Sequence, residues 1–168
     1  MMKVHYAIIA LAFTAAACSA PAPVSETSSP QPPASVVPAD VAAVVSAAAA
    51  GITITNGELD SANNEYEVTG TMPGGDEIEF DLVRPNGAWA VLEIQRDVAW
   101  ASVPAPVRAA AAAAPNPFEP VRVIESKQPA DGSVVYELFA APNQNGAPSG
   151  GPALEVRWHD GKAELVPR

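Results

Sequence analysis

Residues 77–84 show the cleanest alternation of apolar and polar side chains in the chain, which is typical of a strand with one buried face. Residues 65–71 form a second strand-like segment just before it. The Pro-Gly-Gly sequence at 73–75 lies between the two segments and favours a turn. This pattern predicts a β-hairpin whose apolar positions point toward a hydrophobic core.

The position of the turn decides which side chains share a face of this hairpin. If the hairpin is centred on Gly74, Val68 lies opposite Phe80 and Glu67 lies opposite Asp81. Successive side chains of a strand point to opposite faces, so the carboxylates gather on the face away from the apolar residues. We call this predicted surface the acidic face, and its residues are Glu65, Glu67, Glu77, Glu79 and Asp81.

The hairpin belongs to a longer series of predicted elements. Pro38 is suited to the first position of a helix, because its missing N–H has no intrahelical partner there. Valine and alanine then recur at helical spacing until Gly51, which favours a helix end. Strand-like segments separated by turn residues follow at 52–60, 65–71, 77–84 and 88–95.

The same order of elements then begins again. Val103-Pro104-Ala105 starts a second, alanine-rich helix that is expected to run to about Ala114. Further strand-like segments follow at 119–126, 134–140, 154–159 and 162–166. The sequence therefore predicts an α+β protein made of two tandem repeats, residues 38–101 and 102–168. Each repeat is a helix followed by an antiparallel meander, with the helices on one face of the sheet.

Short motifs match between the two predicted repeats. Tyr66-Glu67-Val68 corresponds to Tyr136-Glu137-Leu138, and Asn86-Gly87 corresponds to Asp160-Gly161 before a final strand. Glu77-Ile78-Glu79-Phe80 likewise corresponds to Glu155-Val156-Arg157-Trp158.

With these motifs, the repeat unit resembles the PepSY and PepSY-like domains, and the tandem arrangement is similar to the architecture of beta-lactamase inhibitory proteins. The resemblance covers about residues 38–166. It implies a module that binds proteins, often peptidases or other envelope enzymes, and performs no chemistry itself. The chain departs from the inhibitors because its globular part contains no cysteine for a stabilising disulfide.

The N-terminal residues have the layout of an export signal. Lys3 is followed by the apolar run 7–17 and then by Cys18, the only cysteine of the chain. Ala15-Ala16-Ala17-Cys18 resembles a lipobox, although Leu is more usual at the position of Ala15. Residues 1–17 are therefore predicted to be a signal peptide and Cys18 the site of lipid attachment. The alternative is an ordinary signal peptide cut nearby, with Cys18 incidental.

A segment rich in proline, serine and alanine follows the predicted cleavage point. Residues 18–37 contain almost nothing that could pack, so they are expected to form a semi-extended tether from the membrane. Ser19 after the lipidated cysteine resembles an outer-membrane sorting signal. The protein is thus predicted to lie in the cell envelope, anchored by its lipid to the outer membrane and facing the periplasm.

The charge of the chain restricts its partners. The net charge is −10, and loss of Lys3 with the signal would take it to −11. A protein of this charge is repelled by nucleic acid and by anionic lipid headgroups. We therefore expect no nucleic-acid partner, and a protein partner with a basic surface.

The residues that usually carry catalysis are scarce after the predicted signal. His159 is the only histidine there, and the sequence shows no nucleophile elbow, phosphate loop or dinucleotide motif. A zinc site built from cysteine and histidine lacks its ligands. The sequence predicts no enzymatic activity, no cofactor and no metal; the alternative is a small hydrolase built around His159.

The acidic face and one tryptophan are the candidate binding residues. Like charges directly opposite each other destabilise a sheet, so this face needs solvent, nearby cations or a partner. If Ala90, Leu92 and Ile94 face the helix, Trp89 and Val91 point outward beside the carboxylates, although Trp89 could instead cover the junction of the repeats. A cation site among the carboxylates and a merely solvated surface are the other interpretations.

The sequence favours a non-enzymatic envelope lipoprotein that binds another envelope protein. Its binding would inhibit or modulate a peptidase or other envelope enzyme. The alternative function is a structural or assembly lipoprotein of the cell envelope.

Overall fold

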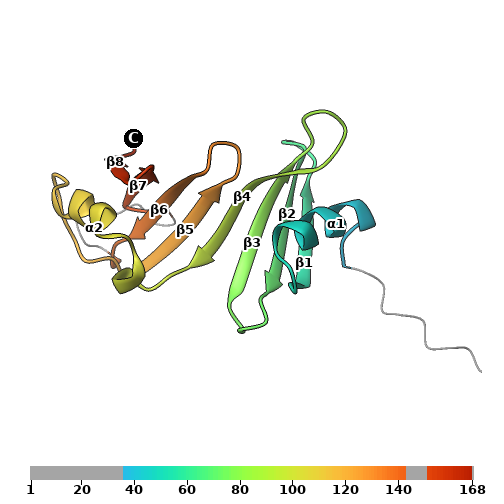
Figure 1. Ribbon diagram of the computed structural model, residues 1–168, viewed down its shortest axis with the longest axis horizontal. Helices are drawn as coiled ribbons and strands as arrows, with labels where there is room; N and C mark the ends of the chain where they lie inside the picture. The colour runs from blue at the N-terminus through green and yellow to red at the C-terminus, as the bar shows by residue number, and fades with distance from the viewer. Residues whose placement is uncertain (1–35, 143–150, 168) are drawn as a thin grey trace, which may run out of the picture. The chain divides into compact units, whose positions relative to one another are not determined.

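The computed structural model describes residues 36–142 and 151–167, which belong to one compact unit of the chain. Within this part, eight antiparallel strands form a single sheet and two α-helices accompany it. The strands follow one another across the sheet in their chain order (Figure 1). The predicted α+β class with an antiparallel sheet is confirmed.

The predicted strands all occur. β2 and β7 have the predicted bounds, and the other strands differ from theirs by one to three residues at an end. The first elements are α1 (Ala39–Ala48), β1 (Thr53–Asp60), β2 (Glu65–Thr71), β3 (Glu77–Val83) and β4 (Ala90–Asp97). They are followed by the 3-10 turn η1 (Trp100–Ser102), α2 (Ala105–Ala112), β5 (Arg122–Gln128), β6 (Ser133–Phe139), β7 (Leu154–His159) and β8 (Lys162–Leu165).

Both helices begin directly after a proline. The carbonyl oxygen of Pro38 accepts a hydrogen bond from the main-chain N–H of Ala42 at 2.9 Å. Pro104 accepts the equivalent bond from Arg108 at 3.1 Å. Proline suits this position because a helix leaves its first N–H groups without intrahelical partners.

The residues of α1 form a first hydrophobic cluster with β2 and β3. Val41 and Val45 on the helix are completely buried, as are Val68, Phe80 and Leu82 on the strands. These strand residues are the apolar positions of the predicted hairpin. Their burial explains why the alternation in residues 65–84 is so regular, since every second side chain leaves water.

The residues of α2 form a second cluster with the later strands. Val107 of the helix is completely buried, together with Leu138 of β6 and Val156 of β7. Trp100 and Trp158 pack against this cluster with part of each side chain still exposed. The two tryptophans add volume to a core whose helix contributes mainly alanine.

Two glycines within strands allow larger side chains to enter the first cluster. A Cβ atom at Gly57 would overlap Val37 Cγ1 and would lie 3.0 Å from the Tyr66 ring. A Cβ atom at Gly70 would lie 2.6 Å from Ile52 Cδ1. Neither position has room for a Cβ atom, so glycine is needed for close packing at both.

A β-bulge in β4 changes the predicted orientation of its side chains. Asp81 pairs with Glu93, but the next residue of β3, Leu82, pairs with Val91, so Leu92 is the extra residue. Val91 therefore shares the core face with Leu82, and Leu92 is 39% exposed. The expectation that Ala90 and Leu92 face the helix and that Val91 faces outward is wrong, whereas Ile94 does lie on the core side, opposite Phe80. The alternation in β4 is interrupted by the inserted residue.

The predicted outward orientation of Trp89 is also wrong. Its ring packs against the first cluster and meets the ring of Tyr66 edge to face, with centroids 5.7 Å apart. The guanidinium of Arg84 lies 4.2 Å from the centre of the Trp89 ring and also pairs with Asp40 of α1 at 3.1 Å. Trp89 thus lies on the helix side of β4 and is not beside the carboxylates.

The predicted signal peptide, Cys18 and most of the predicted tether lie outside the described residues. Within 36–142 and 151–167, no helix has both the length and the apolar character needed to cross a membrane.

Candidate functional site

The acidic face of the β2–β3 hairpin has the predicted register. Val68 pairs with Phe80, Glu67 with Asp81, and Thr69 with Glu79. Because paired residues share a face, the carboxylates lie on the side of these strands opposite the first hydrophobic cluster. The structure therefore brings together the five carboxylates predicted for this face: Glu65, Glu67, Glu77, Glu79 and Asp81.

The acidic face extends over β1 and β4 as well. Glu58 of β1 pairs with Glu67, and Glu93 of β4 pairs with Asp81. Four carboxylates from four neighbouring strands thus stand in one line across the sheet. We call Glu58, Glu67, Asp81 and Glu93 the carboxylate row. Asp60 also lies on this side, opposite Glu65.

Sequence reasoning did not place Glu58 and Glu93 in this site. Glu58 follows a register shift between Ile54 and Asn56, and Glu93 follows the bulge at Leu92. The sequence shows each glutamate near other polar residues, and this pattern does not reveal a one-residue irregularity in the pairing. A turn sequence fixed the register of β2 and β3, whereas no such signal marked these two shifts.

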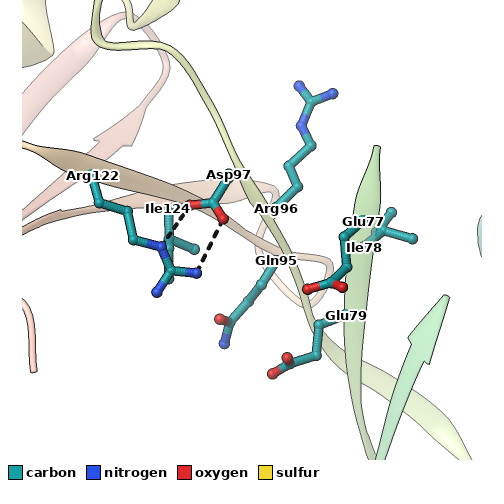
Figure 2. Close-up of a pocket in the computed structure, with 8 residues that line it drawn as sticks. All are labelled: Glu77, Ile78, Glu79, Gln95, Arg96, Asp97, Arg122 and Ile124. Atoms are coloured by element: carbon teal, nitrogen blue, oxygen red, sulfur yellow. Dashed lines mark hydrogen bonds and ion pairs between the residues drawn. The ribbon is translucent and has the colours of Figure 1, made fainter. Parts of the chain in front are cut away.

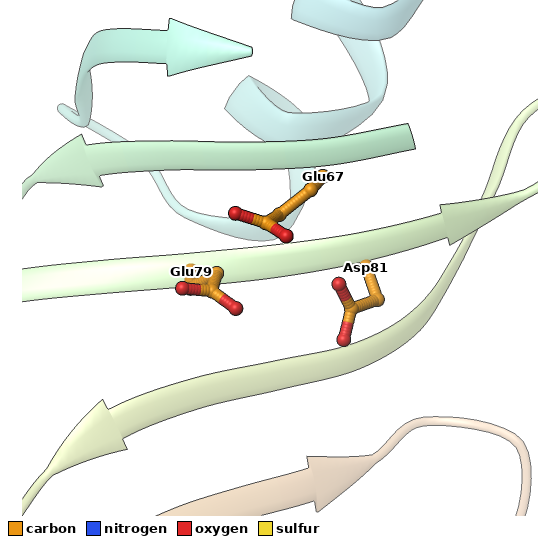
Figure 3. Close-up of side chains that lie close together, drawn as sticks. All are labelled: Glu67, Glu79 and Asp81. Carbon is orange, nitrogen blue, oxygen red and sulfur yellow. The ribbon is translucent and has the colours of Figure 1, made fainter. Parts of the chain in front are cut away.

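Three carboxylates are especially close together. Glu67, Glu79 and Asp81 each offer an oxygen, and these oxygens all lie within 4.8 Å of one another (Figure 3). Hard cations such as Ca²⁺ take six to eight oxygen ligands, and carboxylates are common among them. The three residues could supply part of such a ligand set. The remaining ligands would have to come from water or from another molecule.

The proximity of these carboxylates alters their acid–base behaviour. Partial burial raises the pKa of Asp81 to about 6, and the charges of Glu93, Glu67 and Glu65 add to the effect. The hydrogen bond from Gln95 Nε2 to Asp81 Oδ2, at 3.4 Å, acts in the opposite direction. Partial burial, followed by the charge of Glu67, also raises the pKa of Glu79. Ionisation of these carboxyl groups is unfavourable, because each negative charge repels its neighbours.

The negative field continues onto the later strands. The pKa of Glu137 on β6 is raised by partial burial and then by the charges of Glu93 and Glu155. Gln128 Nε2 donates hydrogen bonds to Glu93 Oε1 and to Ser126 Oγ, each at 2.9 Å. Glu93 is therefore held by a neutral amide and not by a cation in these contacts.

Cations are missing from the part of the acidic face that β1 to β4 provide. The strand register assigns acidic, neutral polar or small apolar residues to this side of these four strands, and no Lys or Arg. Arg84, which follows β3, lies on the other side beside Trp89 and Asp40. The nearest strand with an arginine on the acidic side is β5, where Arg122 pairs with Asp97 at 2.7 Å.

A pocket of about 250 Å³ lies where β3 and β4 separate. Pairing between these strands ends at Glu79 and Gln95, and β4 continues in its pairing with β5. Figure 2 shows the Asp97–Arg122 ion pair on one wall, with Glu77 and Glu79 on the other. The pocket joins the acidic face and widens the surface that a partner could contact.

His159 has polar neighbours but no serine hydrogen-bonded to its ring in the described part of the chain. Its Nε2 lies 3.1 Å from the main-chain oxygen of Asp131, and its Nδ1 lies 3.7 Å from Asp160 Oδ2. Hydrolysis by a serine would need a hydroxyl within reach of the imidazole. These contacts do not provide that arrangement.

No family model, curated protein or solved structure matches the chain.

Proposed function

We propose that the chain is a non-enzymatic envelope lipoprotein whose acidic face binds a protein with a basic surface. The partner would be a peptidase or another envelope enzyme, which the binding inhibits or modulates. The carboxylate row is the observation that carries this proposal. Four acidic side chains are directly opposed across four strands, with no basic side chain among them on these strands.

The physical reason is the energy of the unbound face. Directly opposed like charges destabilise a sheet by up to about 1 kcal/mol per pair. The fold would be served equally well by threonine or glutamine at these positions. Basic side chains of a partner would neutralise the row and lower the pKa of Asp81 and Glu79. Complementary charge would also accelerate association and disfavour acidic partners.

We also infer that the chain contains two PepSY-like repeats with both helices on one face of the sheet. The strand register supports this. One line of paired residues runs through Phe80, Ile94, Lys127, Val134 and Trp158, and so connects the first hydrophobic cluster to the second. The matching tyrosines, Tyr66 on β2 and Tyr136 on β6, are buried in their respective clusters.

In this proposal the N-terminal residues attach the binding module to the outer membrane. Cys18 carries the lipid, and the proline-rich residues after it hold the module away from the bilayer. Intact mass spectrometry of the mature protein tests this part. A mass that corresponds to an unmodified N-terminus beyond Cys18 would remove the anchor.

Capture of envelope proteins tests the binding function. The variant Glu67→Gln/Glu79→Gln/Asp81→Asn removes three charges from the acidic face and keeps the size of the side chains. The matched control, Asp76→Asn/Glu119→Gln/Asp160→Asn, removes three charges elsewhere. Immobilised wild-type protein and the control should retain a basic envelope enzyme at low salt and release it as salt rises.

The triple variant on the acidic face should retain at least about tenfold less of that enzyme. Equal capture by the variant and the wild type at low salt would contradict an electrostatic binding face. Capture of a multi-subunit assembly in place of one enzyme would favour the structural function.

A further inference from the structure

The carboxylate row ends at an open edge of the sheet. β1 is the first strand in the order and pairs only with β2. No main-chain hydrogen bond to its other side occurs among the described residues. Six of its eight residues are exposed, so its outer N–H and C=O groups are accessible for pairing with another strand.

The side chains along this edge differ on the two sides of the sheet. Glu58 and Asp60 lie on the acidic side, where they pair with Glu67 and Glu65. Leu59 lies between them on the core side, opposite Tyr66, and is 51% exposed. The edge thus presents an apolar side chain on one face between two carboxylates on the other.

A second copy of the chain is a poor occupant of this edge. If two copies of β1 paired antiparallel about Glu58, that residue would face itself and each Asp60 would lie beside an Asn56. The two carboxylate rows would then join into one longer row. Like charges in directly opposed positions disfavour this arrangement, and the net charge of −10 on each chain adds to the repulsion.

The opposite edge of the sheet, formed by β8, does not favour a strand of one particular charge. β8 has four residues, and Lys162 and Glu164 both lie on the side of the sheet that carries the acidic face. A strand of that length with charges of both signs discourages pairing in general. β1 is twice as long, and its charged residues, Glu58 and Asp60, are both acidic.

We propose that the edge of β1 accepts an extended segment of the partner as a ninth strand. The segment would have lysine or arginine beside Glu58 and Asp60, and an apolar residue beside Leu59. Neighbouring strands are about 4.8 Å apart, which brings alternate basic side chains within ion-pair reach of both carboxylates. The main chain would supply affinity, and the alternating basic and apolar side chains would supply specificity.

This inference rests on the proposed function, because it specifies how a basic partner engages the acidic face. It adds main-chain pairing, which a basic patch on a folded surface would not require. The two ideas can therefore fail separately.

Synthetic peptides test the strand pairing directly. The probe is a nine-residue peptide that alternates lysine and valine, with blocked ends. Its control has the same side chains but carries N-methyl groups on alternate main-chain nitrogens, which prevents pairing on that edge. Calorimetry at low salt should give an affinity at least about tenfold higher for the unmodified peptide, since several main-chain hydrogen bonds are lost on methylation.

Amide exchange and two variants locate the site. Binding should slow hydrogen exchange in residues 53–60 and leave β8 unchanged. Leu59→Asn and Glu58→Gln should each weaken the peptide several-fold, whereas Leu92→Asn, at another exposed leucine, should not. Equal affinity of the methylated and unmodified peptides would refute the added strand while leaving the acidic face as a binding surface. Absence of peptide binding, or protection confined to other strands, would also refute it.

Discussion

At the scale of single residues, Asp81 is the carboxyl group of the acidic face whose ionisation is most strongly disfavoured. It is half-buried, lies between Glu67 and Glu93 in the carboxylate row, and has a pKa of about 6. The neutral amide of Gln95 donates a hydrogen bond to its Oδ2 at 3.4 Å. Partial burial and the neighbouring negative charges both oppose ionisation of a carboxyl group in this position.

The raised pKa of Asp81 predicts how stability depends on pH. The folded-state pKa of about 6 exceeds the unfolded value of 3.8, so the folded state binds the proton more tightly. This contribution to stability is complete below the unfolded value and is lost as pH rises through about 6. The free energy of unfolding should therefore fall between about pH 4 and pH 7 at this residue.

Asp81→Asn should remove that dependence. We expect the variant to be about 1 kcal/mol more stable than the wild type at about pH 8, after allowance for solvent screening of a half-exposed group. At about pH 4 the two proteins should differ little. Urea denaturation at both values measures the difference, with Asp76→Asn as the control. A variant that is less stable than the wild type at the higher value would show that the charge of Asp81 is balanced in the folded state.

At the scale of elements, the hairpin of β2 and β3 and the strand β4 show where sequence reasoning succeeds and fails. The hairpin register was predictable because a Pro-Gly-Gly turn and strict alternation both act locally. At Trp89, just before β4, and at Val91 and Leu92 within it, the same reasoning was wrong, because one inserted residue exchanges the two faces. Alternation alone cannot locate such an insertion when apolar residues occupy consecutive positions.

Deletion of Leu92 tests the bulge as the cause. The remaining residues would pair regularly, since Val91 already pairs with Leu82 and Glu93 with Asp81. We expect the fold to persist with a loss of about 1 kcal/mol, because the deleted side chain is partly exposed.

Deletion of Thr69 in β2 is the matched control. This strand has no extra residue in its pairing with β3, so the deletion would move apolar side chains to the acidic face on one side of the gap. Circular dichroism and urea denaturation should show a folded protein without Leu92 and an unfolded one without Thr69. Equal damage from both deletions would mean that Leu92 has a packing role of its own.

At the scale of the whole described unit, two hydrophobic clusters are connected by the pairing of β4 with β5. An ion pair reinforces this pairing on each side of the sheet. Arg96 bonds to Glu125 at 2.7 Å on one side, and Arg122 bonds to Asp97 at 2.7 Å on the other. Glu125 is the most buried of these side chains, at 13% exposure, and Tyr136 Oη also donates a hydrogen bond to it.

Loss of both ion pairs should weaken the coupling between the two clusters. The double variant Arg96→Gln/Arg122→Gln should lose about 1–2 kcal/mol and unfold over a broader range of urea. Trp89 reports on the first cluster, and Trp100 and Trp158 report on the second. Single-tryptophan forms of the double variant should give separate urea midpoints for the two clusters. Single-tryptophan forms that keep both arginines should give one shared midpoint.

Arg157→Gln is the control, because its ion pair with Asp131 lies within the second half of the sheet. It should leave a single transition. A single transition in the double variant as well would assign the coupling to the main-chain pairing alone. The pairing of β4 with β5 was not predictable from sequence, since it joins strands separated by a whole helix and carries no turn signal.

The agreement between strand order and chain order has a consequence for biogenesis. Each new strand finds its partner immediately behind it, so the sheet could grow in one direction while the chain emerges from a ribosome or a pore. The growing edges of β2 to β7 would each be covered by the next strand, and the edge of β8 would form only at the end. Only the edge of β1 would be exposed throughout folding. Its carboxylates would repel the same edge of other nascent copies and so oppose pairing there.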